Sequence, residues 1–406
     1  MKRSGLVLII CLVLTLAALP IMSACPAPTP PAEAKTLRIG QIISMSGPFA
    51  PGLETVSQGV EVAAEWINEK GGITIDGQKY TIEIVLVDDK SSPDGAVAAA
   101  NRLIYDENID FIVGPTIPWL AISMARVSEE AKVIRSLAVG TGTPDEMNAD
   151  MRYTFTPFFP TTYFAPAYDY LTEAYPNARK IAIVSPEEPG GIYGMDLSKK
   201  LVQAKGLSVA FAENYPVETM DFFPICTRML EANPDAIDLG MGVEPWYAGI
   251  IKAARQLGFT GPFFSGAPLV PNIITALAGE ENTYDVFSIC VNPESTEYPP
   301  LALEIKQRVE AKYGPTYQDR HIGGWSALWC LVHAIEAAQS LDTTEVAGTW
   351  EKMESIETVF GPATMGGQEL FGINHVVMAP RPLIRVDYGV IKDIRMVTPR
   401  FAELEK

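Results

Sequence analysis

The chain has 406 residues, which exceeds the size at which one hydrophobic core usually stops growing. It carries 49 acidic residues against 31 basic ones. This balance excludes nucleic acid as the main partner, because nucleic-acid phosphates require a basic surface. We therefore expect two domains, each with its own core, in a protein that acts on another class of molecule.

The first residues have the features of a targeting segment. Two basic residues precede an apolar run over residues 6–19, which is short for a membrane span, and small residues then lead to Cys25. This arrangement resembles a bacterial lipoprotein signal, so we expect a signal peptide over residues 1–24 and a lipid on Cys25. Proline-rich residues 25–36 predict a stiff tether. The protein is then expected outside the cytoplasm, anchored to a membrane; an ordinary secretory signal cut nearby is the alternative.

Residues 37–72 predict the first strand–loop–helix unit. Apolar and β-branched residues indicate a buried strand over residues 37–43, and a small polar turn that contains Ser46 follows. Apolar residues at a helical period then indicate a helix that ends at a glycine pair. In open α/β sheets, ligands bind beside the loops at the carboxyl ends of the strands. Ser46 is therefore the first candidate ligand-binding residue.

Strands and helices continue to alternate along the chain. Strands are expected at residues 81–87, 110–113 and 133–138, with helices near 96–104 and 120–131. The pattern restarts after a crossing near Thr156, with strands expected at residues 180–184, 207–211, 236–239 and 262–264. Helices at residues 301–313 and 324–340 and strands in the C-terminal tail complete it. This alternation predicts doubly wound parallel sheets, and the restart predicts two lobes.

Three motifs together resemble a known family. They are MSGP at residues 45–48, a helix ending in N-x-x-GGI at residues 68–73, and a strand ending in Asp88-Asp89. In this order they resemble the branched-chain amino-acid-binding (Leu/Ile/Val-binding, type I periplasmic) proteins of ABC importers. The resemblance implies two doubly wound parallel-sheet lobes joined by a three-segment hinge. The first lobe would comprise residues 37–156 and 292–342, and the second residues 157–291 and 343–406.

The resemblance also implies a function. A small ligand would bind in a cleft between the lobes of a monomer that uses no cofactor, and the closed form would dock on an ABC permease in the membrane. A sensory receptor with the same lobes is an alternative, and a secreted hydrolase is another. The chain has three histidines and lacks the HExxH, GxSxG and phosphate-loop motifs, so we expect neither an enzyme nor a metal site.

The family pattern also implies the ligand-binding residues. On the first lobe, the positions that would hold a ligand carboxylate match Pro118, Trp119, Val139 and Thr141. On the second lobe, the matching positions are Tyr193, Glu244 and Ala267. Trp246 is a further candidate, because its aromatic ring could line an apolar pocket. Ala267 stands where the family has the glutamate that pairs with a ligand ammonium. Either Glu244 supplies that counter-charge, or the ligand is an amide, an aromatic acid or a short carboxylate, because an unpaired buried ammonium is costly.

Cys226, Cys290 and Cys330 are the cysteines outside the signal and the anchor. Their spacing fits neither a zinc site nor a CxxC motif. We expect them to be small buried apolar residues, with at least one free thiol because their number is odd. A disulfide between two of them stays open.

Overall fold

The computed structural model describes residues 34–138, 140 and 142–400. The chain from Lys35 onward forms one compact unit. The expected signal peptide, Cys25, most of the tether and the site candidates Val139 and Thr141 lie outside the described residues. The predicted tether extends to residue 36, but in the structure Lys35 and Thr36 already belong to a strand and pair with the neighbouring strand.

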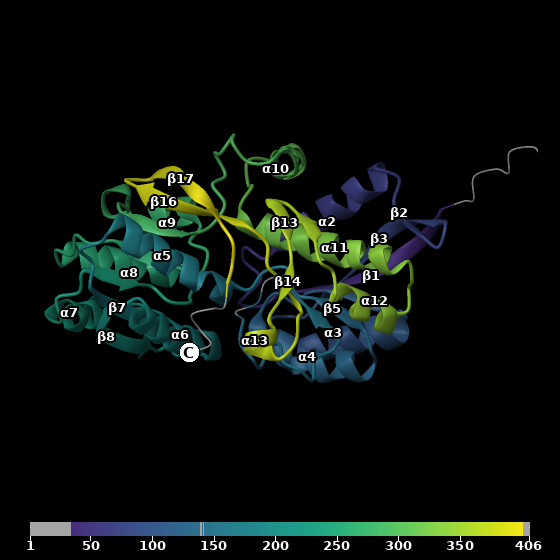
Figure 1. Ribbon diagram of the computed structural model, residues 1–406, viewed down its shortest axis with the longest axis horizontal. Coiled ribbons are helices and arrows are strands. Elements are labelled where there is room, and N and C mark those ends of the chain that lie inside the picture. The colour runs from purple at the N-terminus through teal and green to yellow at the C-terminus, as the bar shows by residue number, and fades with distance from the viewer. Residues whose placement is uncertain (1–33, 139, 141, 401–406) are drawn as a thin grey trace, which may run out of the picture. The chain divides into compact units, whose positions relative to one another are not determined.

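A six-stranded sheet in the order β2-β3-β1-β4-β5-β6 forms the centre of the first lobe (Figure 1). Its strands are β1 (Lys35–Ile43), β2 (Ile73–Ile75), β3 (Gln78–Asp88), β4 (Phe111–Val113), β5 (Ile134–Ser136) and β6 (Thr154–Phe155). All neighbours pair in parallel except β2 and β3, a hairpin whose turn residues Asp76 and Gly77 both have positive φ. Since β1 lies between β3 and β4, the carboxyl ends of β1 and β4 flank the switch point of this sheet.

Helices pack on both faces of this sheet. One core contains residues of α2 (Glu54–Glu69), α10 (Pro300–Tyr313), α11 (Asp319–Ala338) and α12 (Thr343–Trp350). A second core contains residues of α3 (Pro93–Asn101), the π-helical turn η1 (Arg102–Asp106) and α4 (Pro118–Glu130). Helices α2 and α11 therefore join the first lobe although more than two hundred residues separate them in the sequence (Figure 1).

Two glycines allow α2 and α11 to approach closely. A Cβ on Gly59 would lie 2.1 Å from the carbonyl oxygen of His321, and a Cβ on Gly324 would lie 2.0 Å from that of Val56. Neither distance is possible for a real side chain, so only glycine fits at these positions. The contact fixes the N-terminal end of α11 against α2, and this end carries charged residues of the site described below.

A seven-stranded sheet in the order β17-β16-β11-β10-β9-β7-β8 forms the centre of the second lobe (Figure 1). Its strands are β7 (Lys180–Pro186), β8 (Ser208–Tyr215), β9 (Ala236–Asp238), β10 (Phe263–Ser265), β11 (Val286–Ile289), β16 (Arg381–Asp387) and β17 (Val390–Val397). Strands β7 to β11 are parallel, whereas β16 and β17 form an antiparallel hairpin at one edge. Here β7 lies between β8 and β9, so the carboxyl ends of β7 and β9 flank the second switch point.

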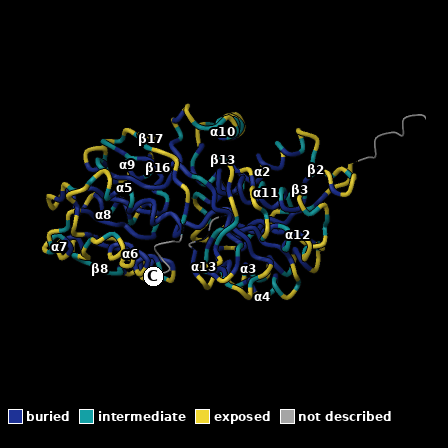
Figure 2. The backbone as a smooth tube through the Cα atoms, viewed as in Figure 1, coloured by how far each residue is buried: buried dark blue, intermediate teal, exposed yellow. Residues whose placement is uncertain are grey.

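Two helical layers cover the second sheet. One core includes residues of η2 (Pro160–Tyr163), α5 (Phe164–Ala174) and α6 (Pro189–Ala204), and another includes residues of α7 (Phe223–Glu231), α8 (Glu244–Gln256) and α9 (Pro271–Ala278). A short turn, η3 (Glu280–Asn282), follows α9. Figure 2 shows that the chain in the middle of both lobes is mostly buried. Cys226, Cys290 and Cys330 are buried free thiols, so the open question of a disulfide is answered for these three residues.

The segment over residues 343–379 packs on the first lobe, not on the second as predicted. It contains α12, β12 (Ile356–Thr358), β13 (Gly361–Ala363), β14 (Met365–Gly366), α13 (Gln368–Phe371) and β15 (Val376–Val377). Asp342 caps α12 by accepting the N–H groups of Thr344 and Glu345, and Trp350 then stacks on Phe155 of β6 with ring centroids 4.3 Å apart. Among the described strands after α12, those of the β16–β17 hairpin return to the second sheet.

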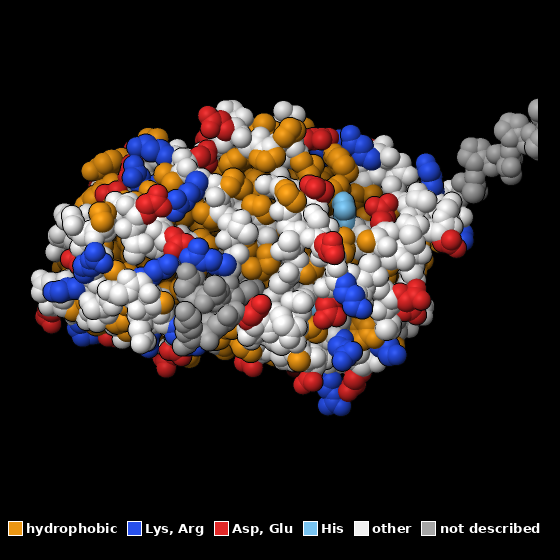
Figure 3. Space-filling model, in the orientation of Figure 1, with side chains coloured by type: hydrophobic (Ala, Val, Ile, Leu, Met, Phe, Trp, Pro, Cys, Tyr) orange, Lys and Arg blue, Asp and Glu red, His pale blue; other side chains and the backbone are white. Residues whose placement is uncertain are grey.

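The predicted fold class is confirmed: two α/β lobes built on mainly parallel sheets are joined by three chain crossings. The crossings follow β6, follow β11 and precede β16. None of the helices in the described part of the chain is both long and apolar enough to span a membrane. On the face seen in Figure 3, basic side chains are interspersed with acidic ones. That face lacks the broad basic surface that nucleic-acid binding requires.

Candidate functional site

The loop after β1 is held in shape by its own hydrogen bonds. The Ser46 hydroxyl donates to Asp88 Oδ2 over 2.6 Å, and Asp88 Oδ1 accepts the N–H groups of Met45 and Lys90 at 2.9 and 2.8 Å. Partial desolvation works to raise the pKa of Asp88, but these hydrogen bonds outweigh it and the pKa is lowered. A ligand that bonds to the Ser46 hydroxyl, as predicted, would therefore compete with the hydrogen bond from Ser46 to Asp88.

The loop after β4 provides a hydroxyl without a partner. Gly114 and Pro115 are joined by a cis peptide bond, and the buried hydroxyl oxygen of Thr116 has no hydrogen-bond partner among the described residues. Pro118 is the first residue of α4, which begins without a side-chain cap. Trp119 is 36% exposed and packs edge-on against Phe49 of the first loop, with ring centroids 5.2 Å apart. This corner thus combines exposed aromatic rings with an uncapped helix N-terminus, which favours anions.

The matching corner of the second lobe also has an unpaired hydroxyl. Tyr193 lies in the first turns of α6, its buried hydroxyl has no partner within the described residues, and desolvation raises its pKa to about 12. The helix itself is capped by Glu188, whose carboxylate accepts the N–H groups of Gly190 and Gly191 at 3.0 and 2.5 Å. The amides of α6 are therefore already bonded, so its contribution to a ligand would come from the Tyr193 side chain.

Glu244 begins α8 and is paired with a residue of the other lobe. Nη2 of Arg320, the second residue of α11, donates to both carboxylate oxygens of Glu244 at 3.1 and 3.2 Å. The Glu244 side chain is 9% exposed and that of Arg320 is 26% exposed. The pair brings together residues 76 positions apart in the sequence. Glu244 therefore already has a basic partner, in contrast to the predicted role as a counter-charge for an ammonium.

Trp246 and Ala267 make packing contacts within the second lobe. Trp246 packs edge-on against Tyr215 with ring centroids 5.9 Å apart. Ala267 is 3% exposed and belongs to the core that contains Phe264 and Phe287. The structure thus brings Trp119 and Glu244 to the carboxyl ends of the sheets, whereas Trp246 and Ala267 take part in core contacts.

Two residues of this region were not among the sequence-predicted candidates. Thr116 lies in a loop that the strand pattern had indicated, and its position directly after a glycine and a proline was the available signal. Arg320 had no comparable signal, because its partner comes from a distant helix of the other lobe. Within residues 34–138, 140 and 142–400, no three His, Cys, Asp or Glu side chains are grouped as a metal site would require.

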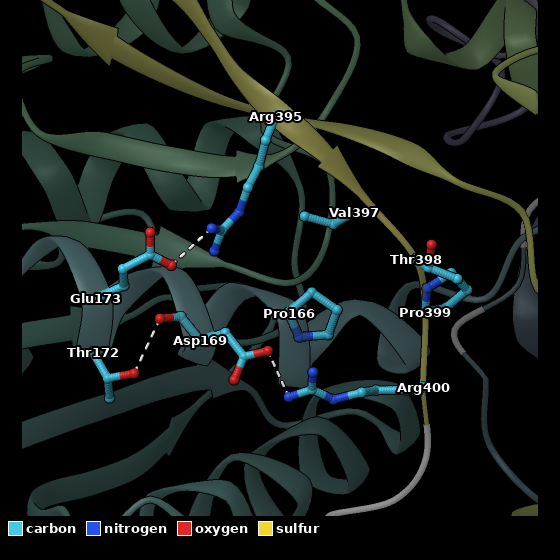
Figure 4. A pocket seen from close by; sticks show the side chains of 9 residues that line it. All are labelled: Pro166, Asp169, Thr172, Glu173, Arg395, Val397, Thr398, Pro399 and Arg400. Atoms are coloured by element: carbon cyan, nitrogen blue, oxygen red, sulfur yellow. Dashed lines mark hydrogen bonds and ion pairs between the residues drawn. The ribbon is translucent and has the colours of Figure 1, made fainter.

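The hollow shown in Figure 4 lies elsewhere, between α5 and the end of β17. Its volume is about 790 Å³, which is enough for a small molecule. Its charged side chains are paired with one another: Arg395 with Glu173 at 2.7 Å, and Arg400 with Asp169 at 2.5 Å. A second hollow, lined by residues 174–178 and 257–262 among others, adjoins the amino ends of the strands. Neither lies at a switch point, where α/β proteins bind their ligands.

Comparisons with known proteins agree with this architecture. A family model described as "Periplasmic binding protein" matches residues 36–388. The Leu/Ile/Val-binding protein BraC3 of Rhizobium johnstonii is 26% identical over 335 residues, which cover 81% of this chain and 87% of that protein.

Two solved structures have the same fold. The branched-chain amino acid transporter substrate-binding protein LivJ of Streptococcus pneumoniae, in complex with isoleucine, has a TM-score of 0.75 at 19% identity and covers 90% of this chain and 100% of its own. A solute-binding protein of an ABC transporter from R. palustris, in complex with 4-hydroxybenzoate, has a TM-score of 0.74 at 23% identity and covers 90% and 98%. Because the family model covers most of the chain, this protein belongs to the periplasmic binding protein family.

Proposed function

We propose that the protein is an extracytoplasmic solute-binding protein that closes its two lobes on a small organic ligand and delivers it to an ABC importer. The observation that carries the proposal is that the buried hydroxyls of Thr116 and Tyr193 both lack a partner in the part of the chain that the structure describes. One follows a switch-point strand of the first sheet, and the other follows a switch-point strand of the second. Buried polar groups normally have a partner. Because both of these hydroxyls follow switch-point strands, where α/β proteins bind their ligands, we infer that a bound ligand supplies their partner.

The family match supports this reading over that of a secreted hydrolase, because its members are binding proteins. Proteins of the same fold hold isoleucine in one case and 4-hydroxybenzoate in another, so the scaffold accepts both amino acids and aromatic acids. A ligand that bonds to both lobes favours the closed form by its difference in affinity for the closed and open forms. That closed form is the species proposed to dock on the permease.

A thermal-shift screen tests the function directly. The chain from Lys35 onward, which is the compact unit, would be heated in the presence of amino acids, amides, aromatic acids and short carboxylates. A compound that binds the native state at about one hundred times its Kd stabilises that state by about 2.7 kcal/mol and raises the melting temperature. We expect at least one class to do so. A flat response to every class would contradict the proposed function.

Replacing Tyr193 with phenylalanine is expected to weaken binding of the best compound about 10-fold or more, because the variant lacks only the hydroxyl proposed to bond to the ligand. The melting temperature of the ligand-free protein should not fall, since that hydroxyl has no protein partner to lose. Titration calorimetry measures the affinity. Thr275→Val, which removes another unpaired hydroxyl on α9, is the matched control and should leave the affinity unchanged. Equal affinities for the Tyr193 variant and the wild type would remove Tyr193 from the site.

We also propose that Cys25 carries the lipid that anchors the protein to a membrane. The support is the sequence pattern before this cysteine and the proline-rich tether after it. In cells, Cys25→Ser is expected to move the protein from the membrane fraction to the soluble fraction. Fractionation followed by immunoblotting measures the change. A Cys25→Ser protein that still sediments with membranes and extracts into detergent would reject lipidation at this residue.

A further inference from the structure

The charge balance around Arg320 narrows the class of ligand. Arg320 belongs to α11 of the first lobe. Its hydrogen bonds to Glu244 of the second lobe are both donated by one guanidinium nitrogen, Nη2. A guanidinium carries five N–H donors on three nitrogens. In the part of the chain that the structure describes, Nε and Nη1 of Arg320 donate to no protein acceptor. The Arg320 side chain as a whole is 26% exposed, so it is partly accessible from solvent.

Arg320 also lies against the first ligand loop. A Cβ added to Gly52 would stand 3.0 Å from Nη1 of Arg320, so this nitrogen lies directly over the loop that follows β1. Phe49, in the same loop, packs with Trp119, and both rings are at least one-third exposed. The unused guanidinium donors and the exposed aromatic pair therefore belong to neighbouring parts of one lobe.

The acids of this region are either bonded to neighbouring groups or buried. Glu244 is bonded to Arg320, Asp88 to the first loop, and Glu188 to the N–H groups at the start of α6. Asp89 accepts the Ser44 hydroxyl at 2.6 Å and the Ser91 N–H at 2.8 Å through Oδ1, whereas its Oδ2 has no partner among the described residues but is buried. An α-amino acid would therefore have to share Glu244 with Arg320, or reach the buried Oδ2 of Asp89, before its ammonium gained a counter-charge. Leaving that ammonium unpaired in the site would cost several kcal/mol.

We propose that Arg320 binds the ligand through a carboxylate, and that the ligand is a monocarboxylate without an α-ammonium group. Guanidinium and carboxylate form charge-assisted hydrogen bonds with matching geometry. Glu244 remains at the N-terminus of α8, where the helix dipole stabilises its negative charge. The Arg320 guanidinium would then donate hydrogen bonds to both Glu244 and the ligand carboxylate. This inference rests on the proposed function, because it names the substrate class and a recognition residue of the same site.

Matched compounds separate the carboxylate from the rest of the ligand. Leucine, isocaproate and isocaproamide share one branched side chain and differ in the ammonium and carboxylate groups; benzoate and benzamide form an aromatic pair. Titration calorimetry on the wild-type protein is expected to show an acid from one of these sets binding at least about 10-fold more tightly than its amide. In the branched set, isocaproate is expected to bind more tightly than leucine. A preference for leucine, or for the amides, would overturn the inference.

Variants then assign the role to Arg320. Arg320→Gln is expected to weaken binding of the preferred acid about 10- to 100-fold, the range for a hydrogen bond to a charged group. Arg126→Gln, which removes an exposed arginine of α4 paired with Glu130, is the control and should leave the affinity unchanged. The double variant Arg320→Gln/Glu244→Gln tests whether Arg320 acts only by neutralising the negative charge of Glu244, because this charge is absent in the double variant. We expect it to bind as weakly as the single variant; recovery of wild-type affinity would contradict direct recognition.

The results separate a failure of the Arg320 assignment from a failure of the proposed function. If leucine or an amide binds tightly and Arg320→Gln leaves that binding unchanged, the protein is still a solute-binding protein and only the assignment of Arg320 fails. If no compound of the wider screen binds, the proposed function itself fails. A preferred acid whose affinity depends on Arg320 in both the single and the double variant supports both.

Discussion

Asp319→Asn is expected to lower the free energy of unfolding by about 3–5 kcal/mol, because it leaves the buried charge of Arg381 without its counter-ion. Asp319 and Arg381 form an ion pair whose side chains are 7% and 4% exposed. Asp319 also accepts the N–H of Val291 at 3.0 Å, and the Arg381 guanidinium lies 4.2 Å from the ring centroid of Phe158. Phe158, Val291 and Arg381 come from the three crossings between the lobes, so one buried pair connects the whole hinge.

Urea denaturation followed by tryptophan fluorescence measures this loss. The double variant Asp319→Leu/Arg381→Met removes both charges, and we expect it to be much more stable than Asp319→Asn, since replacing a buried pair by apolar residues is often nearly neutral. Glu130→Gln on the surface of α4 is the control and should have little effect, because exposed pairs contribute little. A single variant as stable as the wild type, or a double variant that is less stable still, would refute a structural role for the pair.

Acidification from pH 7 to pH 5 is expected to lower stability by about 4 kcal/mol through two buried histidines, about 2 kcal/mol from each. Burial lowers the pKa of both His321 and His375 to about 4, against an ordinary value near 6.5. The unfolded chain therefore takes up protons as the pH falls through 6.5, while the folded protein does not until about pH 4. The stability present above pH 6.5 is lost across that window.

The contacts explain why both rings stay neutral. Nδ1 of His321 accepts the N–H of Gln318 at 3.2 Å, which requires an unprotonated nitrogen, and the ring lies at the N-terminus of α11. His375 is buried, with its ring stacked on Phe155 at a centroid distance of 3.8 Å, and this burial opposes protonation although its Nδ1 lies 2.8 Å from the carbonyl oxygen of Thr154. Urea denaturation at several pH values should show a shallower dependence for His321→Gln/His375→Gln than for the wild type. His333→Gln, whose ring is partly exposed, is the control; an unchanged slope in the double variant would contradict this account.

Much of the fold could be predicted because it depends on local pattern. The strand and polar turn around Ser46 and the restart near residue 180 follow from hydrophobic period and turn residues that are close in the sequence. The third crossing could not be placed in this way. Elements β12 to β15 have only two to four residues each, and the segment is held on the first lobe by distant contacts such as Trp350 on Phe155. Such contacts leave little local signal.

The site was less predictable for the same reason. Loops at strand ends indicated the region of Trp119, Tyr193 and Glu244, but the partner of each polar group is set by tertiary contacts. The Ser46 hydroxyl bonds to an aspartate 42 residues away, and Glu244 bonds to an arginine 76 residues away. A sequence pattern gives the residue type at a strand end, whereas availability for a ligand depends on which neighbouring groups have already paired with it.

A crystal structure of the protein with the most strongly stabilising compound would show where the ligand binds. We predict that the ligand lies between the lobes, bonded to the hydroxyls of Thr116 and Tyr193, which have no partner among residues 34–138, 140 and 142–400. A ligand bound in the hollow of Figure 4 or on another surface, with both hydroxyls still unpaired, would contradict it.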